Sequence, residues 1–392
     1  MYFIFIFLYS FIHFMASVSA KETVSLCMMV KDELEVIEET LLNLLPYIDR
    51  YDITDTGSTD GTPEIIESFM KRHNVPGSMY YTPWNGFGDY GNEVGSQTVM
   101  FTNCYGKADY IFKMDADDLV VGNLKWPENM NKDAYELLLL HESGTLNYGR
   151  LMLLSGSIHW RSVGPVHEYI ATNVSYTRMV LEGDYHILSS VDNRRLSKRN
   201  SGVKKYENDA AVLQKALIEE PKNSRYQFYL AQSYRDADMP EKALVEYLKR
   251  SKMGEWYQEV YYSLHQAAKL KQQLNYSFSE IQEQYLLAYE SHPKRAEPLY
   301  ELSRLFRLAG RPVTAYLYAH AALHLVAEPS FLFFNRYVYE KGILDEICAT
   351  AWYVGAYSEG LDACLKSEID KEYVKNNIKI YSEKLELYSF RE

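Results

Sequence analysis

A short apolar segment that runs directly into three aspartates constrains this chain more than any other feature. Residues 110–122 read YIFKMDADDLVVG, and the first three are aromatic or β-branched, as in a buried central strand. Asp115, Asp117 and Asp118 follow where that strand would leave its sheet, which is where open α/β sheets bind ligands. Asp115 and Asp117 point the same way in extended backbone. Two such carboxylates suit a hard divalent cation that carries phosphate oxygens.

The chain before this triplet alternates between strand and helix patterns. Residues 23–30 (TVSLCMMV) form a continuous apolar run, as expected of a parallel strand buried on both faces. Further strands are predicted at 51–54 and 77–82, with a helix after each of the first two strands. This order implies βαβ units and a mostly parallel sheet. After the triplet, residues 150–154 and 157–161 flank Ser155-Gly156 and predict a β-hairpin.

Beyond about residue 200 the chain becomes helical and repeats itself. Small and aromatic residues recur at intervals of 3, 9 and 4, and the pattern returns 72 residues later, about twice the 34-residue tetratricopeptide period. The two matching sets are Ala231, Tyr234, Ala243 and Tyr247, and Ser303, Phe306, Ala315 and Ala319. A looser copy lies between them at Ala267, Leu270, Ile281 and Tyr285. The last segment, 368–390, predicts a capping helix with Tyr373, Ile378 and Tyr381 facing inward.

Charge excludes one class of partner. The 392 residues hold 41 Lys and Arg against 53 Asp and Glu, a net charge of −12. An acidic chain of this kind is a poor candidate for nucleic-acid binding. Its one basic cluster, residues 194–205, is interpreted as a solvated connection between two domains.

The N-terminus predicts passage into or through a membrane. Residues 2–15 are almost wholly apolar, and the small residues at 18–20 resemble a cleavage site, so residues 1–20 form a signal peptide. No Lys or Arg precedes the apolar run, which leaves an uncleaved anchor as the alternative. The expected location is the lumen of the secretory pathway (ER or Golgi) or outside the cell, with a membrane-anchored or cytoplasmic protein otherwise. Membrane contact is expected only through this segment.

The cysteines and glycosylation motifs are weak signals by themselves. Cys27, Cys104, Cys348 and Cys364 show neither metal-ligand spacing nor a dense disulfide framework, and Cys27 is predicted to be a small core residue. Two tripeptides, 173–175 and 275–277, fit the N-linked glycosylation pattern, which matters only after translocation.

Three segments, each at a predicted strand end, together resemble the family 2 glycosyltransferases, which have the GT-A fold. They are SLCMMVKDE (25–33), DITDTGSTDGTPEII (52–66) and FKMDADDLVVG (112–122). IHWRSVGPVHEYI (158–170) is similar to a segment of a subset of that family, several members of which carry a tetratricopeptide-like tail. The resemblance implies an α/β GT-A domain over 21–195 and an all-α repeat domain over 196–392.

The resemblance also implies a donor site. Asp55 and Asp32 would receive the nucleotide, and a carboxylate can accept the ring N–H of uracil, so a UDP-sugar is the expected donor. Asp115 and Asp117 would hold Mn²⁺ or Mg²⁺ against the diphosphate, and His167 would complete the metal site.

Two carboxylates are candidates for the base that deprotonates the acceptor hydroxyl, Glu168 and Asp118. One departure from the family pattern concerns phosphate binding. Many relatives have Arg-Asn before the helix that leads to the acidic strand, whereas this chain has Gly91-Asn92. A phosphate-binding cation is therefore missing at that position.

The predicted function is a metal-dependent, inverting glycosyltransferase that acts on a hydroxyl of a glycan or protein acceptor. A different class of function is a tetratricopeptide scaffold whose front domain has lost catalysis. A third, a nucleotidyltransferase, would need a glycine-rich basic loop after the first strand, and KDELEV (31–36) is neither. The helical tail is expected to position the acceptor, with homodimerisation as its alternative role.

Overall fold

The structure is a computed structural model that describes residues 21–140, 147–189, 202–328 and 332–389. The chain divides into two compact units, residues 1–200 and 201–392, which are described separately below. The predicted domain boundary at 195/196 lies outside the described residues, as does the predicted signal peptide. Among the helices of the described ranges, none combines the length and the apolar character needed to cross a membrane.

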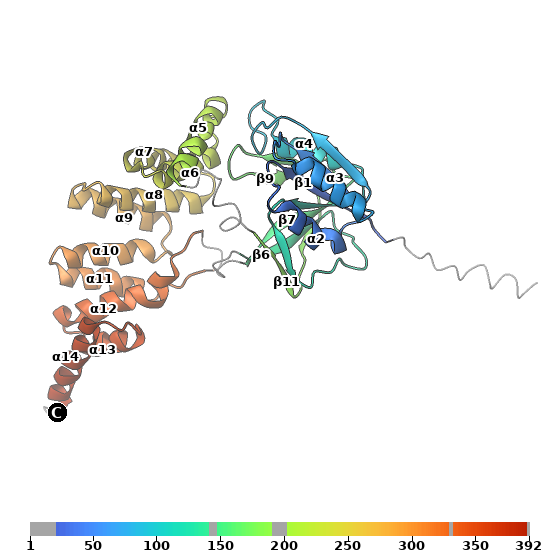
Figure 1. Ribbon diagram of the computed structural model, residues 1–392. Coiled ribbons are helices and arrows are strands. Elements are labelled where there is room, and N and C mark those ends of the chain that lie inside the picture. The colour runs from blue at the N-terminus through green and yellow to red at the C-terminus, as the bar shows by residue number, and fades with distance from the viewer. Residues whose placement is uncertain (1–20, 141–146, 190–201, 329–331, 390–392) are drawn as a thin grey trace, which may run out of the picture. The chain divides into compact units, whose positions relative to one another are not determined.

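The first unit is mixed α/β and contains a mostly parallel, nine-stranded sheet within the described residues (Figure 1). Its parallel half has the order β3-β2-β1-β4, with β1 at Val24–Val30, β2 at Arg50–Asp55, β3 at Gly77–Tyr81 and β4 at Tyr110–Asp115. The path continues through β7 (Asn147–Ser155), β6 (Ala134–Leu140), β11 (Tyr185–Leu188) and β5 (Leu119–Gly122), while β10 (Arg178–Val180) pairs with β6. The four predicted parallel strands are confirmed.

Strand alternation divides the apolar residues of this sheet between two cores. Leu26 and Met28 of β1 face a core that includes helix α2 (Ile37–Leu44), the short η1 (Leu45–Tyr47) and helix α3 (Thr62–Arg72). Cys27 faces the other core, with helix α4 (Ser96–Cys104). Successive side chains of a strand point to opposite faces, so helices cover both faces of the parallel half, as its continuous apolar strands require.

The predicted hairpin at 150–154 and 157–161 is wrong. β7 pairs antiparallel with both β4 and β6, so its two edges are already used. The segment after Gly156 instead leads to β8 (Arg161–Val163), which pairs with β9 (Tyr169–Ala171) in a separate two-stranded sheet. Pairing with partners distant in sequence has overridden the local turn signal.

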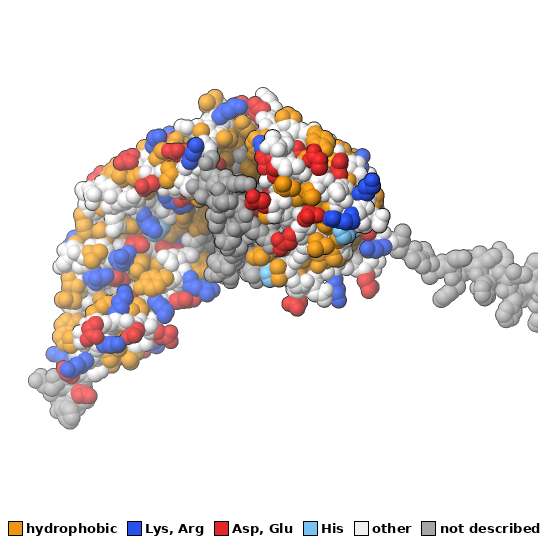
Figure 2. Space-filling view, in the orientation of Figure 1, with side chains coloured by type: hydrophobic (Ala, Val, Ile, Leu, Met, Phe, Trp, Pro, Cys, Tyr) orange, Lys and Arg blue, Asp and Glu red, His pale blue; other side chains and the backbone are white. Residues whose placement is uncertain are grey.

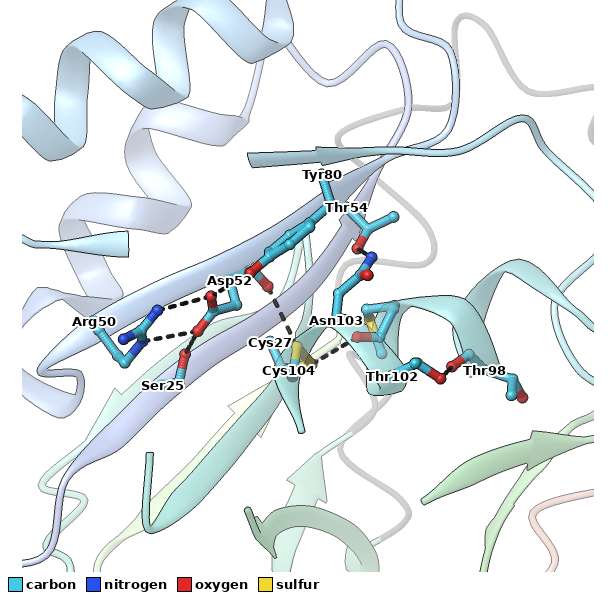
Figure 3. The surroundings of a disulfide bond; sticks show 11 residues. Ser25, Cys27, Arg50, Asp52, Thr54, Tyr80, Thr98, Thr102, Asn103 and Cys104 are labelled. Carbon is cyan, nitrogen blue, oxygen red and sulfur yellow. Dashed lines mark hydrogen bonds and ion pairs between the residues drawn. A yellow bond between two sulfur atoms is a disulfide. The ribbon is translucent and has the colours of Figure 1, made fainter. Parts of the chain in front are cut away.

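Cys27 is fully buried in the core, as predicted, but it is not a free thiol. Cys27 of β1 is disulfide-bonded to Cys104 at the end of α4, and Cys348 is bonded to Cys364. Figure 3 shows the first bond beneath β2, whose buried Asp52 accepts hydrogen bonds from Ser25 and Arg50. All four cysteines of the chain are thus in disulfides, one in each unit.

The second unit is a run of helices in which each packs against the next in sequence, so that they lie side by side in Figure 1. They are α5 (Val203–Glu219), α6 (Ser224–Asp236), α7 (Pro240–Arg250), α8 (Tyr257–Gln273), α9 (Phe278–Ser291), α10 (Glu297–Leu308), α11 (Pro312–Ala322), α12 (Ile343–Thr350), α13 (Tyr357–Lys366) and α14 (Glu372–Ser389), with a π-helical turn η2 (Val338–Gly342) and a 3-10 turn η3 (Ala351–Val354) beside α12.

The small and aromatic residues of the predicted repeats lie at the contacts between these helices. All twelve positions of the three sets are buried. A tetratricopeptide-like helical repeat is therefore confirmed from the helices themselves. The prediction for the last helix holds only in part: Tyr381 is buried, but Tyr373 is 39% exposed, and Val374 faces the core in its place.

We expect the two disulfides to stabilise their units unequally. A cross-link lowers the entropy of the unfolded chain, and the effect grows with loop length. The separations are 77 residues for Cys27–Cys104 and 16 for Cys348–Cys364. Replacing the first pair with alanines should cost the sheet unit about 4–5 kcal/mol, and replacing the second should cost the helical unit about 3 kcal/mol. Urea unfolding of each double variant, followed unit by unit, measures both; equal losses would contradict the loop-length explanation.

Candidate functional site

Three neighbouring parallel strands bring the predicted site residues to one edge of the sheet. β1 lies between β2 and β4, with Val30 opposite Asp55 and Met29 opposite Asp115. Asp32 follows β1 by two residues. Because the strands end level with one another, Asp32, Asp55 and Asp115 all leave the sheet at its carboxyl edge, where α/β folds bind ligands.

The loop after β2, residues 55–62, is shaped by its own carboxylates. Asp55 accepts hydrogen bonds from the backbone N–H of Gly57 and Ser58 at 2.9 and 3.0 Å and from the Ser58 hydroxyl at 2.5 Å. Gly57 and Gly61 have φ values of 101° and 94°, which glycine adopts without a steric penalty. Asp55 therefore folds the loop, whatever further part it has in binding a nucleotide.

The same loop is hydrogen-bonded to the segment after β1. The Thr59 N–H donates to Asp32 Oδ1 at 2.8 Å, and the Asp32 N–H donates to Ser58 Oγ at 2.9 Å. Next along the chain, the Glu33 N–H donates to Thr62 Oγ1 at 2.8 Å. These bonds connect Asp32 to Asp55 through Ser58 and hold the two loops together.

Two cations that the sequence analysis did not single out lie against the first aspartate of the triplet. Lys113 Nζ is 2.5 Å from Asp115 Oδ1, and Arg150 Nη2, from β7, is 3.3 Å from Asp115 Oδ2. Burial alone would raise the pKa of Asp115, but the positive charges of Lys113 and Arg150 outweigh it and hold that pKa well below its usual range. Asp115 is therefore ionised at neutral pH.

A signal for one of these cations was present in the sequence. Lys113 precedes Asp115 by two residues on the same strand, so their side chains point the same way. Arg150 offered no such signal, because its approach depends on the pairing of β7 with β4.

The other two carboxylates of the triplet are buried, Asp117 at 8% exposure and Asp118 at 1%. Among the residues that the structure describes, none makes a hydrogen bond to Asp118 Oδ2. Burial, followed by the charge of Asp115, raises the pKa of Asp118 to about 7. Asp118 is accordingly held partly protonated near neutral pH, unlike Asp115.

The His-Glu segment lies in the turn between β8 and β9. His167 is exposed and has a φ of 54°, a left-handed conformation uncommon for residues other than glycine. Glu168 is half-buried and accepts a hydrogen bond from Gln97 Nε2 at 3.1 Å, and the Ser162 hydroxyl donates to Gln97 Oε1 at 2.9 Å. Gln97 lies in the first turn of α4, so that helix positions Glu168.

A tryptophan close to this segment belongs to the core. Trp160 is 4% exposed, packs with Met100, Phe101 and the disulfide, and donates to the Ser155 carbonyl at 2.9 Å. Trp160 therefore packs the core and presents no exposed ring face.

The predicted metal ligands do not form a group of three. Within the ranges described above, no three His, Cys, Asp or Glu side chains come close enough together to hold an ion, so Asp115, Asp117 and His167 do not converge. Mg²⁺ and Mn²⁺ sites that serve phosphate transfer often take only one or two carboxylates, with substrate phosphates and water as the other ligands. Asp115 and Asp117, beside the Asp118 Oδ2 atom that has no hydrogen-bond partner among the described residues, fit an ion of that kind and do not fit an all-protein site.

Comparison with known proteins finds similarity of fold only. No family model matches the chain, and no curated protein matches it. Among solved structures, MamA is 15% identical with a TM-score of 0.33, covering 46% of this chain and 96% of its own. YrrB, a TPR protein with an unusual peptide-binding site, is 14% identical with a TM-score of 0.34 over 45% and 85%. A thermophilic TPR protein of Thermus thermophilus, TTC0263, is 16% identical with a TM-score of 0.29 over 47% and 92%.

Asp118 should make the stability of the sheet unit depend on pH. Its pKa is about 7 in the folded chain and about 3.9 in an unfolded one, so the folded state binds more protons in between. Stability is therefore lost as the pH rises from about 4 to 7. Asp118→Asn should remove this loss and be more stable than the unchanged chain at pH 8 by about 2–4 kcal/mol.

Urea unfolding at pH 5 and pH 8 measures this difference. Asp133→Asn is the matched control, because hydrogen bonds from Thr177 lower the pKa of Asp133 and its contribution is lost as the pH falls instead. Parallel pH profiles for Asp118→Asn and the unchanged chain would contradict the assignment.

Proposed function

We propose that the chain is a metal-dependent glycosyltransferase of the family 2 type with a GT-A catalytic domain. It would transfer a sugar from a nucleotide-diphosphate donor, expected to be a UDP-sugar, to a hydroxyl of a glycan or protein. The observation that carries the proposal is the meeting of Asp32, Asp55 and Asp115 at the carboxyl ends of three adjacent parallel strands. The strand order β3-β2-β1-β4, followed by an antiparallel extension, supports it.

The donor would lie across the ends of β1, β2 and β4. Asp32 and Asp55, already linked through Ser58, would face the nucleoside. Asp115 and Asp117 would hold Mn²⁺ or Mg²⁺ with donor phosphates and water as the other ligands, because the predicted third ligand, His167, does not converge with them. When bound, such an ion neutralises the charge that develops on the leaving diphosphate.

Arg150 supports donor binding from another strand. The position before α4 that carries an arginine in many relatives is Gly91 here, but the guanidinium of Arg150 lies beside Asp115. Guanidinium groups bind phosphates through charge-assisted hydrogen bonds. Arg150 would thus supply the phosphate-binding cation that Gly91 does not.

Of the two candidate bases, we favour Glu168. It lies in the exposed turn between β8 and β9 and is oriented by Gln97. Asp118 is 1% exposed and held partly protonated, so an acceptor hydroxyl would not reach it easily. Glu168 would take the proton from the acceptor as the hydroxyl oxygen attacks the anomeric carbon.

Two further parts of the proposal concern location and acceptor. Disulfides form and persist in oxidising compartments, so the two in this chain support a protein of the secretory pathway. Helical repeats present extended surfaces for partners, and the second unit would position the acceptor or join two chains.

A second candidate, a repeat scaffold with an inactive front domain, is favoured by one observation. The oxygens of Asp115 already have two cationic partners, and those of Asp55 serve their own loop. A screen of nucleotide sugars, scored by metal-dependent release of nucleoside diphosphate, separates the two candidates. No release from any donor would favour the scaffold.

Asp117→Asn should remove metal-dependent donor binding and sugar transfer while the chain stays folded. The substitution preserves the shape of a buried side chain but removes the charge that would attract the cation. Calorimetric titration of the donor with and without Mn²⁺, alongside circular dichroism, measures both effects. An active variant, or activity in excess chelator, would show that no metal acts at Asp117.

Arg150→Gln should weaken donor binding by about 10–100-fold, the loss expected for one charge-assisted hydrogen bond of about 1.5–3 kcal/mol. Arg150→Lys should lose less, because the charge remains. The control is Arg178→Gln, which removes an exposed pair with Glu136 on another part of the sheet. If both glutamine variants bind donor equally well, Arg150 does not contact the diphosphate.

A further inference from the structure

Both glycosylation tripeptides of the sequence are displayed on the surface. Asn173-Val174-Ser175 follows β9 and Asn275-Tyr276-Ser277 joins α8 to α9, so there is one in each unit. All six residues are exposed, including Val174 at 54% and Tyr276 at 41%. Both tripeptides therefore lie at the surface of the residues that the structure describes.

The first turn is fixed at its base and open at its tip. Tyr176 packs edge-on against the buried Trp160 at 5.1 Å between ring centres. The Thr177 N–H and hydroxyl both donate to Asp133 Oδ2, at 2.7 and 2.8 Å. These contacts hold the residues just after the tripeptide, so Asn173 stands clear of the sheet.

The second turn is a helix junction with its own hydrogen bonds. Asn275 has a φ of 56°, a conformation that asparagine tolerates better than most residues. Ser277 caps α9 in a reciprocal capping box with Glu280. Ser277 therefore stabilises the start of α9 in the folded chain, while Asn275 remains exposed to solvent.

The disulfides supply the second, independent observation. Cys27–Cys104 and Cys348–Cys364 indicate that both units fold where thiols are oxidised, and in eukaryotic cells that compartment also attaches N-linked glycans. The two units carry one disulfide and one exposed tripeptide each. This step rests on the secretory location proposed above and not on the glycosyltransferase activity.

We propose that Asn173 and Asn275 are both modified with N-linked glycans. The donor class is a lipid-linked oligosaccharyl diphosphate, used by the host's own transferase. The side-chain amide nitrogen attacks the anomeric carbon, a C–N bond forms, and the C–O bond to the diphosphate breaks. The amide loses one proton to the transferase, and the lipid diphosphate leaves with the bonding electron pair.

The test expresses the full chain, once with its own N-terminus and once behind an added secretory signal, in a eukaryotic cell. Digestion with peptide N-glycosidase and gel mobility count the glycans. Digestion should shift the unchanged chain on the gel by the mass of two glycans. The Asn173→Gln and Asn275→Asp variants should each shift by the mass of one glycan, and the double variant should not shift. Asp replaces Asn275 because it accepts the left-handed backbone and leaves the Ser277 cap intact. The control variants Ser175→Thr and Ser277→Thr keep both motifs and should shift by the mass of two glycans.

Two outcomes distinguish the glycosylation proposal from the proposal that the protein enters the secretory pathway. A disulfide-bonded chain behind the added signal that shows no change on digestion would overturn the glycosylation. A second outcome is that the chain carries two glycans when it is expressed with the added signal, but carries no glycans and has free thiols when it is expressed with its own N-terminus. That outcome would confirm the two sites and overturn the secretory role of residues 1–20.

Discussion

The parallel register of β2, β1 and β4 is the constraint on which the candidate site depends. Three acidic positions far apart in the sequence, Asp32, Asp55 and Asp115, meet only because these strands end level with one another. A shift by two residues in either pairing would move one carboxylate about 7 Å along the sheet. The hydrogen bonds between the loop at 55–62 and the segment after β1 then fix the loops in a single arrangement. The register of the backbone pairing thus determines where these carboxylates lie.

Charge balance at the end of β4 is the second organising element. Three aspartates in such close succession would repel one another strongly in a partly buried setting. Lys113 and Arg150 compensate for one of them, and Asp118 avoids the remaining cost by holding a proton. Asp115 is ionised and Asp118 is partly protonated, so the net charge of the cluster depends on how far Asp118 is protonated. A bound cation or the phosphates of a ligand would change that protonation. On the visible face in Figure 2, positive and negative side chains of the described residues are interspersed.

Much of the fold followed from local patterns, and the two failures in strand pairing and cysteine pairing share one cause. The apolar run at 23–30 and the spacing of Ala231, Tyr234 and Ala243 predicted a strand and a repeat, because burial on both faces and helix contact act over a few residues. The hairpin after Ser155 and the pairing of Cys27 with Cys104 depended on partners far away in sequence, which periodicity does not reveal. In the site, Asp32, Asp55 and Asp115 were predicted to lie close together, but the approach of Arg150 to Asp115 was not.

The disulfide at the end of α4 has a consequence for chemistry as well as for stability. The first turn of the same helix contains Gln97, which holds the Glu168 carboxylate, and the helix ends at Cys104, which is bonded to β1. The disulfide therefore fixes the C-terminal end of α4, and the N-terminal end of the same helix positions the Glu168 carboxylate that we propose accepts the proton. Disulfide formation in an oxidising environment would therefore stabilise the same helix that positions the proposed base.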